Sequence, residues 1–135
     1  MKQYLYVPRF ELSDSAFNKY LIENDTSLSA LKLLGLCNYN LTNYQKGIDI
    51  FSKAISIRPD DASLYNYRGS CYLKLMKYNF ATTDFNKAIK LQPDYASAYN
   101  NKAICIYRNQ DIAKASIADL KECELNFSKA LEFDS

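Results

Sequence analysis

The chain has 135 residues, 48% hydrophobic and 24% charged, a composition typical of one small globular domain. The absence of histidine and of a glycine-rich phosphate loop excludes Ser-His-Asp and Cys-His catalysis, histidine metal sites and P-loop nucleotide binding. The net charge is only +2 and no long basic run occurs, so we expect neither nucleic acid nor a membrane as partner.

The chain begins with residues 1–12, which we expect to be extended. Pro8 and Arg9 interrupt the apolar residues there, so no signal peptide is predicted. No run of about 18 apolar residues occurs anywhere, as a membrane-spanning helix would require. A cytoplasmic, reducing setting is therefore expected.

Three glycines and three prolines supply little turn chemistry, which predicts long helices and argues against a sandwich or barrel. Pro59 and Pro93 are expected to end helices, because proline lacks the backbone donor. Asp60, Asp61 and Asp94 are expected to cap the helices that follow. In chain order the predicted helices span 14–24, 28–40, 44–57, 62–75, 78–91, 96–108 and 111–132.

An internal repeat is the main feature of the sequence. Residues 28–61 align with residues 62–95 over 34 positions without a gap. Residues shared by the two copies include Gly35 and Gly69, Phe51 and Phe85, Ala54 and Ala88, and Pro59 and Pro93. A third copy begins at Ala96, but its Phe-x-Lys-Ala motif, Phe127 to Ala130, comes eight residues late. A half copy of the motif precedes the first repeat at Phe17.

Each copy predicts two helices, here called helix A and helix B. Gly35 and Gly69 fall in the middle of helix A, where glycine costs roughly 1 kcal/mol relative to alanine. The third copy has Ala103 at the same position. We therefore predict that small size is needed because helix A approaches helix B closely there.

These residues resemble the tetratricopeptide repeat, a 34-residue helix–turn–helix unit with aromatic, small, alanine and proline residues at fixed offsets. In the middle copy the matching residues are Tyr65, Gly69, Tyr72, Ala81, Phe85, Ala88 and Pro93. The 35-residue RNA-reading helical repeat is the nearest alternative, against which the period and the proline placement argue.

The resemblance implies an all-α fold, a right-handed superhelix (α-solenoid) of three helix–turn–helix repeats with an N-terminal half-repeat. Residues 1–135 then form a single domain. Its expected parts are the extended segment 1–12, the half-repeat helix 13–27, repeat 1 at 28–61, repeat 2 at 62–95, and repeat 3 at 96–135 with a lengthened second helix.

The resemblance further implies that the inner face of the A helices lines a concave groove that binds an extended peptide or a partner's helix. Asparagine amides can bond a peptide backbone, and lysine or arginine a carboxylate. The alternative is a merely solvated helix face. The expected groove residues are Ser29, Lys32, Leu33, Leu36, Tyr39, Asn40, Ser63, Asn66, Tyr67, Ser70, Lys74, Ser97, Asn100, Asn101, Ile104, Tyr107 and Arg108.

Family members that clamp the C-terminal carboxylate of heat-shock chaperones use a fixed set of lysine, asparagine and arginine positions. Lys32 fits that set. The other four positions hold Leu36, Tyr67, Ser97 and Asn101, which do not fit it. We therefore expect the clamp to be absent.

Three of the four cysteines, Cys37, Cys71 and Cys105, repeat at intervals of 34 residues. They could be a metal or redox site, but equivalent positions in stacked repeats lie too far apart for a disulfide. Cysteine often fills small buried sites, and we favour that interpretation. Cys123 lies outside the pattern and is expected to be a free thiol. No metal and no cofactor is predicted.

The last segment, 111–135, contains no glycine or proline to end a helix. Its apolar residues recur at alternating spacings of three and four, which is typical of a helix face that contacts a partner helix. The alternative is that this segment folds back on the chain. We expect Leu120, Cys123 and Phe127 to be partly exposed and to form a homodimer through the C-terminal helix.

No set of residues converges as an acid–base or nucleophile pair, so the chain is not expected to be an enzyme and has no catalytic residues. The favoured function is non-catalytic protein binding, as scaffold or adaptor. The alternative is a small cytoplasmic chaperone for secreted proteins, similar to the three-repeat type III secretion chaperones. Residues 28–110 carry a net charge of +6, which suggests an acidic protein or peptide partner.

Overall fold

The computed structural model describes residues 27–109 and 117–134, and over these residues it contains only helices and turns. The boundaries predicted for the five helices from 28 to 109 are confirmed to within one residue. The extended segment 1–12, the half-repeat helix and the predicted start of the last helix at 111 lie outside the described residues. The helices are α2 (Leu28–Asn40), α3 (Tyr44–Ile57), α4 (Ala62–Lys74), α5 (Tyr78–Leu91), α6 (Ala96–Asn109) and α7 (Ile117–Asp134).

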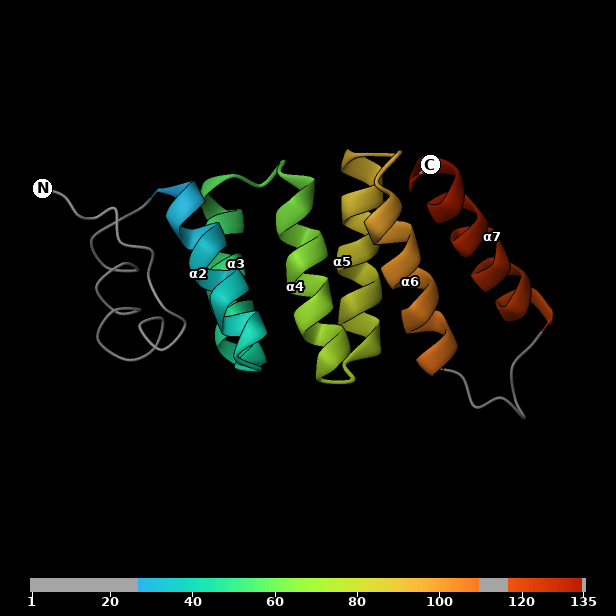
Figure 1. Ribbon diagram of the computed structural model, residues 1–135, viewed down its shortest axis with the longest axis horizontal. Coiled ribbons are helices and arrows are strands. Elements are labelled where there is room, and N and C mark those ends of the chain that lie inside the picture. Colours follow the sequence, from blue (N-terminus) through green and yellow to red (C-terminus); the bar gives the residue numbers. More distant parts are fainter. Residues whose placement is uncertain (1–26, 110–116, 135) are drawn as a thin grey trace, which may run out of the picture.

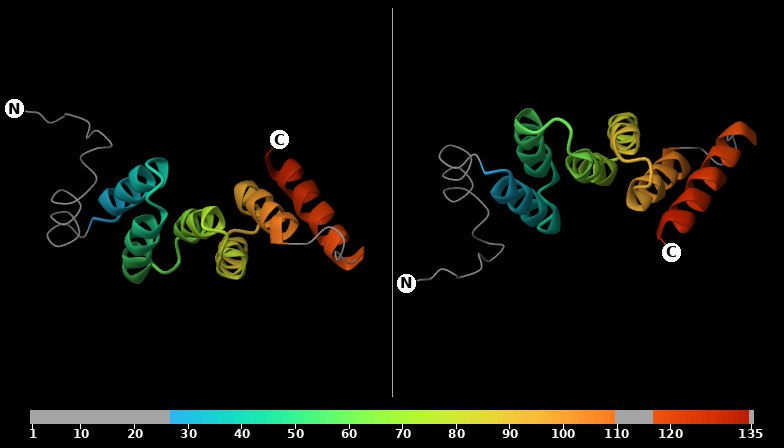
Figure 2. Two further views of the ribbon diagram at one scale, coloured as in Figure 1. Left: turned by 90° about the horizontal axis from the view of Figure 1, so that it is seen from below. Right: turned by 90° about the horizontal axis from the view of Figure 1, so that it is seen from above.

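The six helices stand side by side along one axis, from α2 at one end to α7 at the other (Figure 1). Each helix packs against the next one in the chain, and α4 also contacts α2 and α6. Seen along the helices, α2, α4 and α6 alternate with α3, α5 and α7, and α7 crosses the end of the array obliquely (Figure 2). The fold is an all-α helical solenoid of helix–turn–helix repeats, as the sequence predicted.

Of the aspartates predicted to cap helices, Asp61 does so and Asp94 does not. Asp61 precedes α4, and its carboxylate accepts a hydrogen bond from the backbone N–H of Ser63 at 3.0 Å. The prediction that Asp94 caps α6 is wrong, because Tyr95 is the residue whose carbonyl accepts the first bonds of that helix. The carbonyl of each proline accepts a hydrogen bond from the hydroxyl of the tyrosine six residues later. The Tyr65 hydroxyl donates to Pro59 at 2.8 Å, and the Tyr99 hydroxyl donates to Pro93 at 2.9 Å.

The glycines of the A helices provide the close approach that the sequence predicted. A Cβ atom on Gly35 would lie 2.5 Å from the ring of Phe51, and one on Gly69 would lie 2.7 Å from the ring of Phe85. Both rings are fully buried. Each phenylalanine of helix B therefore occupies the space that the glycine of its own helix A leaves open.

This contact predicts a non-additive double-mutant cycle. Gly69→Ala alone should lower the free energy of unfolding by about 1–3 kcal/mol, because the ring of Phe85 must move away. In a Phe85→Leu background the same change should be neutral, or should stabilise by up to about 1 kcal/mol through helix propensity. Urea unfolding of the four proteins measures the cycle. Equal effects of Gly69→Ala in both backgrounds would show that the two residues do not share this space.

The third repeat departs from the pattern at the same crossing. Ala103 replaces the glycine and is fully buried, and Cys123 of α7 lies over it, with its Sγ 3.8 Å from the Ala103 carbonyl. Phe127, the late phenylalanine of the motif, remains 39% exposed. The third repeat thus places the Cys123 thiol beside Ala103, where the first two repeats place a phenylalanine ring against a glycine.

Candidate functional site

The A helices gather many of the predicted groove residues around one cavity of about 320 Å³. We call this cavity the groove pocket. Helices α2, α4 and α6 each contribute to its lining, which consists of Leu36, Tyr39, Asn40, Asn66, Tyr67, Ser70, Ser97 and Asn101, together with Phe51 of α3. Three consecutive repeats thus form one site.

Two tyrosines form the aromatic part of the groove pocket, and both are held by neighbouring rings. Tyr39 meets Tyr44 edge-on, with ring centroids 5.5 Å apart, and Tyr67 lies at the same distance from Phe51. Burial, followed by the charges of Tyr44 and Cys71, raises the pKa of Tyr39. The two rings are therefore fixed surfaces against which an apolar side chain can pack.

The polar part of the groove pocket is a hydrogen-bonded network between α4 and α6. Asn66 is only 3% exposed, and its amide donates to the Ser97 hydroxyl at 3.3 Å and to the Tyr95 hydroxyl at 3.4 Å. Its oxygen accepts from Asn101 at 3.1 Å, and Asn101 also contacts the Ser70 hydroxyl at 3.4 Å. These bonds join α4 to α6 and engage the Asn66 amide within the chain, so a role of Asn66 in peptide binding stays a prediction.

Lys32 is also engaged within the chain. Its Nζ lies 2.7 Å from Oδ2 of Asp61, and Oδ1 of the same carboxylate accepts a hydrogen bond from the Ser63 hydroxyl at 2.7 Å. Burial acts to raise the pKa of Asp61, but the bonds from Lys32 and Ser63 outweigh it and lower the pKa. Lys32 therefore joins α2 to the start of α4, a role that competes with any contact to a partner's carboxylate.

The remaining predicted groove residues do not line the groove pocket. Leu33 and Tyr107 are 53% and 59% exposed, and Ile104 is half-buried against the core. Asn100 lies at a second cavity, between α6 and α7. The other exposed members of the predicted set are Ser29, Lys74 and Arg108.

Cys37, Cys71 and Cys105 are buried free thiols, as the interpretation of small buried sites predicted. A Cβ atom on Gly47 would lie 2.9 Å from the Sγ of Cys71, so this cysteine fills the gap beside a glycine of the preceding helix B. Among the described residues, no group of three or more His, Cys, Asp or Glu side chains is placed to hold a metal ion. None of the described helices is long and apolar enough to cross a membrane.

The buried thiols make stability sensitive to alkaline pH. Burial, and then the charge of Asp84, raises the pKa of Cys71 from its ordinary 9.0 to about 12. Above pH 9 the unfolded chain loses this proton while the folded chain keeps it. The free energy of unfolding should therefore fall by about 1.4 kcal/mol per pH unit for this group, up to the folded pKa.

Urea unfolding at pH 8, 9.5 and 10.5 measures this slope. Burial also raises the pKa of Cys37 and Cys105, so these thiols add to the same trend. A Cys71→Ala variant should lose one group's share of the slope and keep the rest. An unchanged slope in that variant would contradict the assignment to Cys71.

The sequence did not indicate the ion pair between Arg68 and Asp84. The guanidinium donates to both carboxylate oxygens, at 2.9 and 2.8 Å, and to the Ser52 hydroxyl at 3.0 Å. Burial raises the pKa of Asp84, although the bonds from Arg68 act in the opposite direction. The pair joins α3, α4 and α5, and none of its residues lines the groove pocket, so it is part of the framework that holds the A helices in place.

The fold is that of a helical repeat protein of the solenoid class, because its helices come in pairs with a 34-residue period and its A helices line a groove. Residues 29–61 and residues 62–95 each match a family model for the tetratricopeptide repeat. The chain belongs to the tetratricopeptide repeat family. A search of curated protein sequences finds no match.

Solved structures of other tetratricopeptide proteins share the fold. A MamA crystal structure is 23% identical with a TM-score of 0.74, over 93% of this chain and 66% of that chain. The first domain of Spaghetti (RPAP3), bound to the HSP90 peptide SRMEEVD, is 24% identical with a TM-score of 0.72, over 82% of both chains. The Arabidopsis OM64 domain is 20% identical with a TM-score of 0.70, over 79% of this chain and 82% of that one. This chain spans about two thirds of the MamA chains, 65% and 66%.

Proposed function

We propose that the protein is a non-catalytic interaction module that binds an extended segment of a partner protein in the groove pocket. The observation that supports this is the lining of the groove pocket, in which three A helices bring two fixed tyrosine rings beside polar side chains. Rings bind apolar side chains, and an exposed amide such as that of Asn40 can bond a peptide backbone. The related Spaghetti domain binds a peptide, which agrees in kind with this function.

The partner segment that we propose is acidic. Residues 28–110 carry eleven basic and five acidic residues, and Lys74 and Arg108 are exposed in the last turns of α4 and α6. The HSP90 peptide is not proposed as the ligand. A carboxylate clamp uses asparagine where this chain has Leu36 and Tyr67, and it uses lysine and arginine where this chain has Ser97 and Asn101. The buried free thiols suit the cytoplasmic, reducing setting that we include in this proposal.

Two added carboxylates at the groove pocket should weaken binding of an acidic peptide. Asn40→Glu together with Ser97→Glu places charge at two exposed lining residues. Peptides are first selected from a displayed random library on the wild-type chain, and their affinity is then measured by fluorescence anisotropy. The double variant should bind about tenfold more weakly or worse, because like charges are brought together.

The matched control is Asn86→Glu with Ser56→Glu, the same exchanges at exposed residues of α5 and α3. It adds the same charge outside the groove pocket and should change the affinity by less than about twofold. Equal losses in both double variants would contradict binding in the groove pocket. Capture of a secreted client at one-to-one stoichiometry would instead favour the chaperone alternative.

A further inference from the structure

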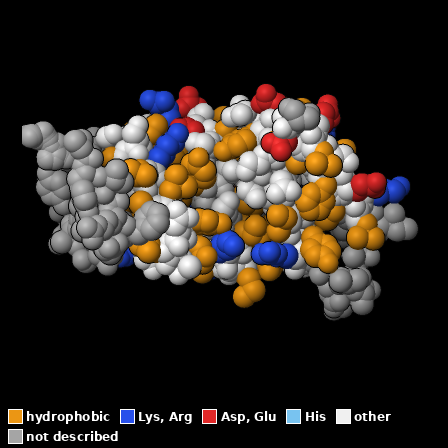
Figure 3. Space-filling view, viewed as in Figure 1, with side chains coloured by type: hydrophobic (Ala, Val, Ile, Leu, Met, Phe, Trp, Pro, Cys, Tyr) orange, Lys and Arg blue, Asp and Glu red, His pale blue; other side chains and the backbone are white. Residues whose placement is uncertain are grey.

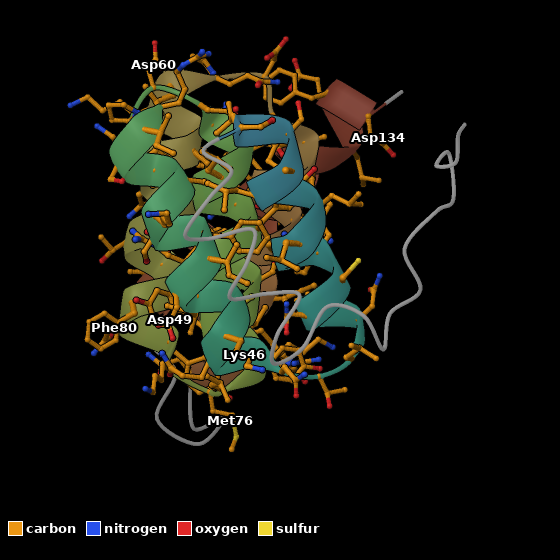
Figure 4. The ribbon with its side chains drawn as sticks, turned by 90° about the vertical axis from the view of Figure 1, so that its left-hand side faces the viewer. Lys46, Asp49, Asp60, Met76, Phe80 and Asp134 are labelled. Atoms are coloured by element: carbon orange, nitrogen blue, oxygen red, sulfur yellow. The ribbon has the colours of Figure 1, made fainter. Side chains whose placement is uncertain are left out.

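A second cavity, of about 510 Å³, lies at the open end of the array between the last two helices. We call it the end slot. Its lining includes Ala96, Ser97 and Asn100 of α6, and Phe127, Leu131 and Asp134 of α7. Figure 3 shows hydrophobic side chains over this end of the face, and Figure 4 labels Asp134 on α7, at the far end of the array from α2.

Inside the array the equivalent position is always filled by the next A helix. Helix α4 packs on α2 and α3, and α6 packs on α4 and α5. Asn66 and Asn100 are the same residue type 34 positions apart. Asn66 is buried because Ser97 and Asn101 of the next A helix bond its amide, whereas Asn100 is exposed. The end slot therefore resembles the receiving side of a repeat junction, and no helix of the described residues 27–109 and 117–134 fills it.

The α7 side of the end slot is uncovered in the same way. Aligned on the Phe-x-Lys-Ala motif, Leu131 corresponds to Ile89, which packs beside Ala98 of the next A helix. Leu131 is 74% exposed. Leu120, at 56% exposed, and Phe127, at 39%, extend the bare face along α7. The residues that a further A helix would cover are present, and they are apolar.

The helices that fill the two internal slots show which occupant fits. Helix α6 presents Ala98, Asn101 and Cys105 to the repeat before it, spaced i, i+3 and i+7. In α4 the same spacing holds Leu64, Tyr67 and Cys71, of which the first and last are fully buried. An occupant of the end slot is thus an amphipathic helix with apolar or small residues at i and i+7.

Charge selects among such helices. Glu124 and Asp134 share one face of α7 with Leu120, Phe127 and Leu131, since these residues are spaced by three and four. Residues 117–134 hold two basic and five acidic residues, a net charge of −3. A second copy of α7 would bring a like charge against this face, which argues against the homodimer expected from the sequence. A basic helix is attracted to it.

We propose that the end slot docks an amphipathic α-helix of a partner protein, basic on its polar face, in the position of a further A helix. The two cavities share Ser97 at their rims, but Phe127 and Leu131 line only the end slot and Tyr39 and Tyr67 line only the groove pocket. A partner could occupy one site without the other.

The chain's own α6 supplies a probe for this site. A fluorescein-labelled peptide of residues 93–109 carries the junction pattern and a net charge of +1. Its anisotropy should rise saturably on titration with the full chain. Leu131→Glu should weaken binding about tenfold or more, because it places a charge in the apolar contact.

Leu125→Glu is the matched control, since Leu125 is 55% exposed on α7 but lies off the face of the end slot. It should change the affinity by less than about twofold. A peptide with Lys102→Glu and Arg108→Glu should bind about tenfold more weakly than the native peptide.

Three results would overturn the proposal. One is the lack of saturable binding up to about 1 mM chain. Another is an equal loss with Leu125→Glu and Leu131→Glu. The third is a dimer in light scattering that Leu131→Glu dissociates, which would make a second copy the occupant. Leu131 does not line the groove pocket, so failure here leaves the proposed peptide binding intact.

Discussion

Replacing Phe85 with alanine should lower the free energy of unfolding by about 3–5 kcal/mol. Phe85 is fully buried and packs with Leu73 of α4, Ala81 of α5 and Cys105 of α6, so one ring joins three helices. The cavity that it leaves cannot be filled from the facing helix, because Gly69 has no side chain there. A small domain is stable by about 5–15 kcal/mol, so this loss is a large share of the total.

Phe80→Ala is the matched control for this prediction. Phe80 lies on the same helix but at the surface of the molecule (Figure 4), and it is 61% exposed. Its ring stacks on that of Tyr72, with centroids 5.3 Å apart. Its removal should cost only about 0.5–1.5 kcal/mol, the value of one exposed aromatic pair. Urea unfolding of both variants gives the comparison. Similar losses for Phe80 and Phe85 would mean that the phenylalanine motif does not set the repeat core.

The sequence predicted the fold from features that recur every 34 residues. Glycine in a helix, phenylalanine sixteen residues later and proline after that recur because each repeat has the same crossing and the same end. The departure of the third repeat could also be read from the sequence, where Ala103 replaces the glycine and the phenylalanine motif comes late. What could not be read is that Cys123 covers Ala103, since this contact depends on where α7 crosses.

The candidate site was predicted less completely than the fold. The position of a side chain along helix A does not show whether it bonds to the next repeat or faces a cavity. Asn66 and Asn100 hold the same place in their helices. Only Asn66 has a following A helix above it, so its amide is used in the junction while Asn100 faces the end slot. A search for polar pairs between neighbouring repeats, such as Asn66 with Ser97 (31 residues apart) or Lys32 with Asp61 (29 residues apart), would have separated junction residues from groove residues.

The ion pair of Arg68 with Asp84 was missed for the opposite reason, since it breaks the repeat. In the first repeat the same two positions hold Leu34 and Ile50. Both are 2% exposed and belong to one apolar cluster. The fold therefore accepts either an apolar pair or an ion pair at this place, and the two repeats of one chain contain one of each.

Removing only one partner of this ion pair should strongly destabilise the folded protein. Asp84→Ala should lower the free energy of unfolding by about 3–5 kcal/mol, because the Arg68 charge is left largely buried with no carboxylate. The double variant Arg68→Leu with Asp84→Ile copies the first repeat and should be within about 1 kcal/mol of the wild type, or more stable, since no charge is left buried. Urea unfolding measures both.

Glu122→Ala is the control. It removes the 3.4 Å ion pair of Glu122, whose side chain is 48% exposed, with Lys102, and it should cost less than about 1 kcal/mol. A double variant as unstable as Asp84→Ala would show that the second repeat, unlike the first, depends on the ion pair itself.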